Sequence, residues 1–493
     1  MSERLISFAH AREYGLFDGD PNEDGQLPVC FREGGDFGML AELQRVAGRP
    51  LALEVLPVER FQQRLSEAFN QGGTRASRMV EDIADSVDLS SLLEEMPETQ
   101  DLLEAEENAP VIRLINALLT EALREGASDI HFELFESRAT VRFRIDGALR
   151  DVIEPQRGLH AAIVSRIKIM GGLDIAEKRL PQDGRITLRL AGRPVDVRVS
   201  TLPTAHGERV VLRLLDKSAN RLDLDSLGMP PQTLTRLQGL LAQPHGILLV
   251  TGPTGSGKTT TLYAALAQMD ARELNIMTVE DPIEYELDGI GQTQINSRIE
   301  MSFARALRAI LRQDPDVILI GEIRDLETAQ IAVQASLTGH LVLATLHTND
   351  APSAMTRLVD MGVEPFLLAS SSIGVLAQRL VRRLCPACRV AYEPDAAEQK
   401  LLGIGPEHLI YRACGCEACA QTGYKGRGGI YELMVFDENT RSLIHDGANE
   451  QTLRTHSASH GMQSLREDGF ARVRAGYTAV DEILRVTRSE SGD

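Results

Sequence analysis

Residues 252–259 form a glycine-rich segment, Gly-Pro-Thr-Gly-Ser-Gly-Lys-Thr, with the spacing G-x-x-x-x-G-K-[ST] of a phosphate-binding P-loop. An apolar run at 247–250 precedes it and a helical pattern at 260–266 follows it. Glycines let backbone N–H groups turn toward phosphate oxygens, and the helix presents its positive end to the same anion. We expect Lys258 to reach the β- and γ-phosphates of a nucleotide and the Thr259 hydroxyl to ligate Mg²⁺. The expected nucleotide contacts are Gly252, Pro253, Thr254, Gly255, Ser256, Gly257, Lys258, Thr259 and Thr260.

Two further apolar segments end in carboxylates. Residues 317–322, Val-Ile-Leu-Ile-Gly-Glu, place Glu322 where a Walker B acid would hold Mg²⁺, although Gly321 stands where an Asp is usual. Residues 279–284, Val-Glu-Asp-Pro-Ile-Glu, close another strand with three acids. One of them could orient or deprotonate an attacking water. The alternative for this second segment is an acidic surface turn around Pro282.

His340 and His347 lie at opposite ends of a predicted strand, 341–346. At the edges of a nucleotide-binding sheet they could bind or sense a γ-phosphate, whereas a lone strand histidine is more often a satisfied core group. Both interpretations stay open from the spacing alone. A helix predicted to begin at Ser302 carries a basic face, which is either solvated or directed at a neighbouring subunit or a phosphate. The residues of this face are Arg305, Arg308 and Arg312.

Five of the six cysteines fall between residues 385 and 419. Four of them form two C-x-x-C pairs with 27 residues in between, Cys385 with Cys388 and Cys416 with Cys419. Four thiolates suit a closed tetrahedral Zn²⁺ site, so the metal would be structural. Redox-active dithiols are the alternative. Cys414 could substitute as a ligand, and the isolated Cys30 is predicted to be a small buried hydrophobic residue.

Composition narrows the class of protein. Of the 493 residues, 43% are hydrophobic and 25% charged, as in globular proteins. The net charge of −19 argues against broad nucleic-acid binding, which needs a basic face. No apolar run approaches the roughly 18 residues of a membrane span, and residues 1–7 lack the apolar core of a signal peptide. We therefore expect a cytosolic protein that reaches a membrane only through a partner.

Changes of pattern divide the chain. Residues 1–80 carry no readable motif. Residues 81–110 contain eleven acidic residues and no Lys or Arg, which indicates a solvated linker, with short helical turns around its leucines as the alternative. Residues 111–217 are predicted to be an α+β domain, because a helix at 111–124 is followed by half-buried strands of period two. These strands are 140–145, 185–190, 195–199 and 209–214.

Residues 218–231 are predicted to be a second linker. Residues 232–493 then form an α/β nucleotide-binding domain, because short apolar strands alternate with helices as in a parallel sheet. The predicted strands are 247–250, 275–280, 317–320 and 341–346. This domain would also contain the cysteine module, 384–426, and C-terminal helices at 438–488.

Together these segments resemble the secretion-ATPase superfamily, specifically the type II secretion system ATPases (protein E) and the related type IV pilus extension ATPases. The resemblance runs from residue 127 to about 480. It rests on the P-loop occurring together with segments 278–284, 321–325, 339–349 and 422–432. Segments 173–185 and 200–209 favour the secretion branch.

The resemblance implies a RecA-like ATPase domain, a preceding PAS-like α+β domain, a small N-terminal domain and a four-cysteine zinc insert. It implies a homohexamer that holds nucleotide between two lobes of the chain. By similarity Glu284 is the water-activating acid, Glu322 is the Walker B acid, and Arg198 and Arg213 reach the phosphates. Residues 1–80 would dock on the inner-membrane platform protein L, which places the chain on the cytoplasmic side of the inner membrane.

We therefore expect Mg²⁺-dependent hydrolysis of ATP to ADP and phosphate that powers pseudopilus assembly and protein export. A type IV pilus extension ATPase would share all of these segments and is the alternative. A nucleotide-dependent switch that scarcely hydrolyses is disfavoured by the acids of 279–284. A DNA translocase is disfavoured by the acidic charge and the lack of tryptophan.

Overall fold

The computed structural model describes residues 14–18, 26–34, 37–48, 50–58, 60–61, 64, 109–190, 193–216 and 223–487. The predicted acidic linker lies outside the described residues except for 109 and 110, and so do residues 218–222 of the second predicted linker. None of the described helices is long and apolar enough to cross a membrane.

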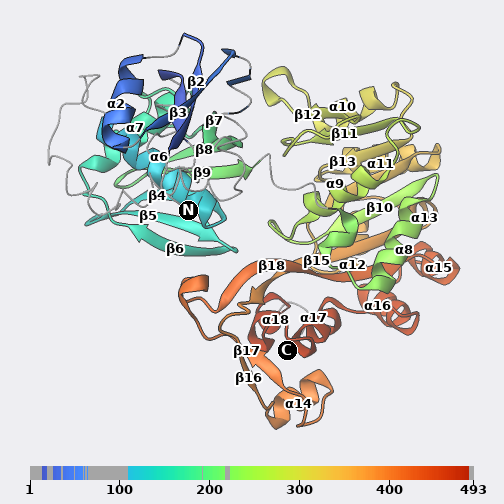
Figure 1. The fold of residues 1–493 in the computed structure, drawn as a ribbon. Coiled ribbons are helices and arrows are strands. Elements are labelled where there is room, and N and C mark those ends of the chain that lie inside the picture. The colour runs from blue at the N-terminus through green and yellow to red at the C-terminus, as the bar shows by residue number, and fades with distance from the viewer. Residues whose placement is uncertain are drawn as a thin grey trace. The chain divides into compact units, whose positions relative to one another are not determined.

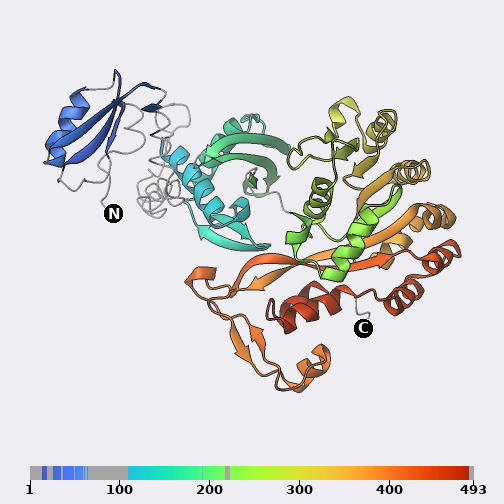
Figure 2. The same ribbon diagram turned by 45° about the vertical axis from the view of Figure 1, so that its right-hand side comes forward.

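The N-terminal part contains a three-stranded sheet and a helix, blue in Figure 1. Its elements are β1 (Leu16–Asp18), β2 (Leu27–Arg32), α2 (Phe37–Ala47) and β3 (Leu51–Leu56). Strand β2 pairs antiparallel with β1 and parallel with β3. Figure 2 shows α2 against these strands, and Leu43 of the helix packs with Val29 and Phe31 of β2. This part therefore has an apolar core of its own.

The middle part is a six-stranded sheet in the order β6-β5-β4-β9-β8-β7 with two helices packed on it. Its elements are α6 (Ala109–Arg124), β4 (Ala127–Leu134), β5 (Ala139–Ile145), β6 (Ala148–Ile153), α7 (Leu159–Met170), β7 (Gln182–Leu190), β8 (Arg193–Thr204) and β9 (Gly207–Asp216). Pairing is antiparallel from β5 through β4, β9 and β8 to β7. The predicted helix at 111–124 and the four predicted strands are confirmed.

The third part is built on a seven-stranded sheet in the order β12-β11-β13-β14-β10-β15-β18. Its strands are β10 (Gly246–Thr251), β11 (Ile276–Glu280), β12 (Gly291–Gln294), β13 (Val317–Ile320), β14 (Leu341–Leu346), β15 (Ser372–Leu384) and β18 (Tyr424–Val435). Six of these strands are parallel, and β18 closes one edge antiparallel to β15. The predicted parallel sheet is confirmed.

Helices cover both faces of this sheet. Alternate residues of β10 enter two different cores: Ile247 packs with residues of α10, α11 and α12, and Leu248 packs with residues of α8 and α9. Because both faces are buried, the strand is apolar throughout instead of alternating. The covering helices are α8 (Pro231–Leu241), α9 (Lys258–Gln268), α10 (Phe303–Ile310), α11 (Leu326–Leu337), α12 (Ala351–Asp360) and α13 (Pro365–Ser371).

The segment between β15 and β18 carries the cysteine module, and the chain ends in helices. The module contains β16 (Val390–Tyr392), α14 (Ala396–Leu402), β17 (Ile410–Arg412) and the short 3-10 helix η3 (Glu417–Cys419), orange in Figure 1. The last helices are α15 (Glu438–His445), α16 (Glu450–Ser459), α17 (Leu465–Arg474) and α18 (Val480–Val486). The remaining short turns are η1 (Leu224–Leu227) and η2 (Ser297–Ile299).

Candidate functional site

The P-loop joins the end of β10 to the start of α9, as predicted. Gly252, Gly255 and Gly257 have φ angles of +147°, +79° and +88°, which only glycine adopts without strain. A Cβ atom on Gly252 would lie 2.4 Å from the backbone oxygen of Gln378. Gly257 is the N-cap of α9 and no side chain caps this end. The N–H groups of the first turn are therefore left for an anionic ligand.

Lys258 begins α9 with its side chain folded back on the loop. Its Nζ donates hydrogen bonds to the carbonyl oxygens of Gly252 (2.7 Å) and Pro253 (3.1 Å). Burial lowers the pKa of Lys258 to about 8, and the nearby charge of Glu322 acts in the opposite direction. The ammonium group must exchange the two carbonyls for phosphate oxygens when a nucleotide binds. The next residue, Thr259, is exposed in the first turn of α9.

Gln378 on β15 holds the P-loop in place, and the sequence analysis did not identify it. Its Nε2 donates to the Ser256 carbonyl oxygen (2.7 Å), and its Oε1 accepts from the Thr261 hydroxyl (2.8 Å). The residue is 2% exposed. It therefore ties the loop and the following helix to a neighbouring strand. An isolated polar residue in the apolar run of 372–384 was the available signal.

Glu322 follows β13 at the same edge of the sheet as the P-loop. Its carboxylate forms an ion pair with Arg324 and lies 3.2 Å from Nε2 of His347. His347 follows β14, whose last residue, Leu346, pairs in register with Thr251 just before the P-loop. The structure therefore brings Glu322 and His347 together beside the P-loop.

His340 lies at the other end of β14. In the parallel register its neighbour Leu341 pairs with Gly246, at the start of β10. The Nδ1–H of His340 donates to the carbonyl oxygen of Ala335 (2.7 Å) at the end of α11. This placement is that of a histidine satisfied by its own fold, and it argues against contact with nucleotide at the P-loop of the same chain.

The acidic segment 279–284 is anchored to the P-loop helix. Glu280, at the end of β11, is 3% exposed and accepts hydrogen bonds from the Tyr263 hydroxyl of α9 and from Gln292 Nε2 (3.1 Å). The backbone N–H of Glu284 donates to the same Tyr263 hydroxyl (3.3 Å). Burial, followed by the Glu280 carboxylate, raises the pKa of Tyr263. The first acid of the segment is thus a buried anchor, and Glu284 lies within bonding distance of α9.

Arg198 and Arg213 lie in the middle part on β8 and β9, where they are direct partners in the antiparallel register. Directly paired residues share one face of a sheet. Arg185 of β7 pairs with Arg198 on its other side, so three arginines cross neighbouring strands in a row. Arg213 Nε donates to Asp129 (2.9 Å). The structure brings the two predicted arginines together with each other, and their role toward nucleotide stays a prediction.

The basic face predicted on α10 is present. Ser302 caps the helix by accepting from the N–H of Arg305 (3.3 Å). Arg305, Arg308 and Arg312 are exposed, and Arg308 pairs with Glu327. This fits a solvated face, and the intersubunit interpretation stays a hypothesis.

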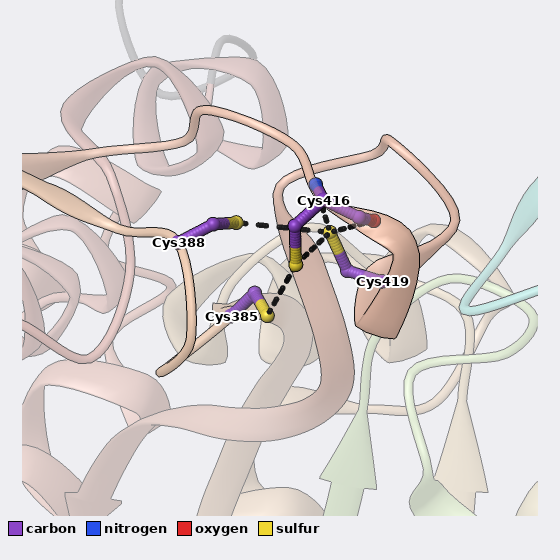
Figure 3. A group of neighbouring side chains, drawn as sticks. All are labelled: Cys385, Cys388, Cys416 and Cys419. Atoms are coloured by element: carbon purple, nitrogen blue, oxygen red, sulfur yellow. Dashed lines mark hydrogen bonds between the residues drawn. The ribbon is translucent and has the colours of Figure 1, made fainter.

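The four predicted metal ligands converge, as Figure 3 shows. The Sγ atoms of Cys385 and Cys416 are 3.9 Å apart, and Cys419 Sγ lies 3.7 Å from those of Cys388 and Cys416. A tetrahedral Zn²⁺ with bonds of about 2.3 Å places its sulfurs about 3.8 Å apart. The residues therefore fit a four-thiolate metal site. Such spacing is far longer than the roughly 2.05 Å of a disulfide.

Backbone N–H groups surround these sulfurs. Cys416 and Gly423 donate to Cys419 Sγ, each at 3.2 Å, and Gly415 donates to Cys388 Sγ at 3.3 Å. Burial acts to raise the pKa of the Cys419 thiol, but these N–H groups stabilise the thiolate and bring its pKa to about 6. A thiolate is the form that binds metal.

The remaining cysteines stay outside this cluster. Cys414 is exposed and is not among the four residues whose ligand atoms lie within 4.8 Å of one another. Cys30 is half-buried against the N-terminal core, so the prediction of a fully buried residue is only partly met.

Comparison with known proteins agrees with this site. The family of type II/IV secretion system proteins matches residues 104–485, and the N-terminal domain family of GSPII protein E matches residues 5–69. Type II secretion system protein E of Pseudomonas aeruginosa is 58% identical over 489 residues, covering 99% of this chain and 97% of the relative. Type II secretion system ATPase E of Vibrio cholerae is 54% identical over 491 residues, covering the same shares.

Solved structures share the fold. The pilus retraction motor PilT with bound ADP is 26% identical, with a TM-score of 0.52 over 77% of this chain and 97% of PilT. The ATPase DotB of Legionella pneumophila, 19% identical, has a TM-score of 0.59 over 80% of this chain and 98% of its own. The third part thus has the α/β fold of secretion ATPases. On its sequence matches, the chain belongs to the family of type II/IV secretion system proteins.

Proposed function

We propose that this chain is the ATP-hydrolysing motor of a type II secretion system, driving pseudopilus assembly and protein export. The observation that carries the proposal is the meeting of three elements at one sheet edge. These are the P-loop, Glu322, and the 279–284 segment tied to α9 through Tyr263. An ATPase needs a phosphate cradle, a metal-binding acid and an acid that positions water, and this edge supplies a candidate for each.

In this mechanism the N–H groups of residues 252–260 bind the phosphates and Lys258 neutralises the β- and γ-phosphate oxygens. The hydroxyl of Thr259 and the carboxylate of Glu322 are oxygen donors that would hold Mg²⁺, which when bound neutralises charge on the phosphates. Glu284 orients the attacking water and accepts its proton. His347 senses the γ-phosphate through its contact with Glu322. His340 is kept only as a structural residue.

Arg198 and Arg213 stabilise the charge that develops on the phosphates during transfer. In this proposal the middle part is a PAS-like lobe, the ATPase domain is RecA-like, and nucleotide lies between them in a homohexamer. Specific activity should then rise as chains assemble. If it is constant from dilute chains to the full oligomer, the ring proposal is wrong.

The four-cysteine site binds a structural Zn²⁺ in this proposal. Four thiolates leave no open position for substrate or water. The spacing of the sulfurs and their N–H donors support the choice of a closed thiolate site over a redox dithiol.

Residues 1–80 recruit the chain to the inner membrane by binding the cytoplasmic part of the platform protein L. Support comes from the match of residues 5–69 to the N-terminal domain family of GSPII protein E. The remainder of the domain scheme, with linkers at 81–110 and 218–231, belongs to the same proposal. Nucleic acid is not a partner.

Secretion by a strain that lacks the chain tests the proposal. The wild-type chain should restore export of secreted proteins, whereas Glu284→Gln should bind the platform but not restore export. A chain that restores pilus extension without restoring secretion would instead support the type IV pilus alternative. Pull-down of membrane proteins with the full chain, compared with a chain lacking residues 1–80, identifies the platform.

A further inference from the structure

A second group of metal-ligand side chains lies between two C-terminal helices, distant in sequence from the four cysteines. Asp437, at the N-cap of α15, and His456 and His460, at the end of α16, have ligand atoms that lie within 4.8 Å of one another. The two histidines are four residues apart, so they project from the same side of the helix. The mechanism above uses none of the three.

The distances suit a transition metal. Asp437 Oδ1 and His456 Nε2 are 3.3 Å apart. A tetrahedral Zn²⁺ with bonds of about 2.0–2.1 Å places its nitrogen and oxygen ligands about 3.4 Å apart. The rings of His456 and His460 stack with centroids 4.2 Å apart, which keeps the second imidazole beside the first.

The groups around these ligands orient them for binding. The Nδ1 atom of His460 lies 2.9 Å from the carbonyl oxygen of His456, and because a carbonyl only accepts, Nδ1 carries the proton. Its Nε2 therefore has a free lone pair. This is the arrangement in which histidines ligate metals, with the other ring nitrogen donating to a backbone carbonyl.

The carboxylate is also prepared. The N–H of Thr440 donates to Asp437 Oδ1 at 2.6 Å and fixes the side chain in the cap. This bond, helped by His456, lowers the pKa of Asp437 to about 2, so the group is ionised at neutral pH. Asp437 and His460 are exposed and His456 is half-buried, which leaves an open side for water as a fourth ligand.

We propose that Asp437, His456 and His460 form a second metal site, for Zn²⁺ or a similar transition-metal ion, that fastens α15 to α16. Two imidazoles with one carboxylate select such ions over Mg²⁺ or Ca²⁺, which prefer oxygen ligands alone. Binding would stabilise α16, whose Arg454 pairs with Asp350, the N-cap of α12, at 2.7 Å. This proposal does not depend on the chain being a secretion motor.

The test is zinc titration of the full-length chain after the four-cysteine site has been loaded, with bound metal counted by elemental analysis. The wild type should bind about one further equivalent, and its melting temperature should rise with added Zn²⁺. His460→Ala removes an exposed ligand and should weaken this second equivalent at least as much as loss of an outer-shell partner does, about 10–100-fold. Asp437→Asn keeps a capping side chain and should weaken it too.

His445→Ala is the matched control, because His445 is exposed on α15 and lies outside the cluster. It should bind like the wild type, and Cys416→Ser should lose the first metal and keep the second. Failure of the wild type to bind more zinc than the cysteines hold would overturn the proposal. Unchanged binding by His460→Ala, with circular dichroism showing a folded chain, would overturn it as well.

Discussion

The P-loop and the cysteine module are both ligand sites lined by backbone N–H groups, yet they are held in shape differently. The P-loop is fixed by the fold around it: by the buried strand β10, by glycines that only a close approach permits, and by Gln378. Between residues 385 and 423 the buried apolar or cysteine side chains are Cys385, Leu402, Ile410 and Cys419, two of which are ligands themselves. The nucleotide site is therefore preformed, whereas the cysteine module depends on its metal.

Removing a metal ligand is the strongest way to break this comparison. Cys416→Ser, or prolonged chelation, should take the bound zinc from about one equivalent at the cysteines to nearly none, since metal affinity is also folding free energy for such a module. Limited proteolysis should then cut within 385–423. Nucleotide binding should be retained, because the P-loop shares no ligand with the module.

Chelation that abolished nucleotide binding as fully as it opened the module would show that the two sites are not independent. Cys414→Ser is the control, since Cys414 is exposed and outside the cluster. It should keep its zinc.

A smaller effect is expected from loosening the P-loop. Gln378→Ala leaves the Ser256 carbonyl and the Thr261 hydroxyl without a buried partner, which costs about 1–3 kcal/mol. If that cost falls on the shape of the loop, nucleotide affinity should drop by about 5–100-fold. Fluorescent-nucleotide titration measures it, with Gln334→Ala on the exposed side of α11 as control. Equal affinities for both variants would contradict the assigned role of Gln378.

The smallest effect concerns pH. Because burial lowers the pKa of Lys258 to about 8, the unfolded chain holds this proton more tightly than the folded chain does. The lysine therefore opposes folding below pH 8, and this penalty, of at most about 3 kcal/mol, disappears as the pH rises from about 8 to about 10.4.

Denaturant unfolding of the wild type and Lys258→Met at pH 7.5 and 9.5 measures this penalty. The stability advantage of the methionine variant should shrink at the higher pH. An advantage that is constant, or that grows, would show that Lys258 is not held in a desolvated position.

The same contrast explains what the sequence could predict. Strands buried on both faces are continuous apolar runs, so β10, β11, β13 and β14 were found at nearly their observed bounds. The P-loop and the cysteine pairs were found because their spacing is local. The prediction of a type II secretion ATPase is confirmed by the family match and by relatives at 54% and 58% identity.

What was missed depends on contacts between distant residues. Strand β18 begins Tyr-Lys-Gly-Arg-Gly-Gly, which does not resemble a strand, and it forms because β15 offers an edge for pairing. Gln378 acts on a loop 122 residues away, and Asp437 lies 19 residues from His456. The position of His340 at the far end of β14 followed only from the parallel register with β10.

The central claim is that the preformed edge beside the P-loop hydrolyses ATP, and phosphate release from the assembled oligomer tests it most directly. The account predicts turnover by the wild type and its loss in Lys258→Ala, which removes the phosphate-binding ammonium. Glu284→Gln should bind ATP with wild-type affinity and release phosphate at least about 100-fold more slowly. Full turnover by Lys258→Ala would contradict the account.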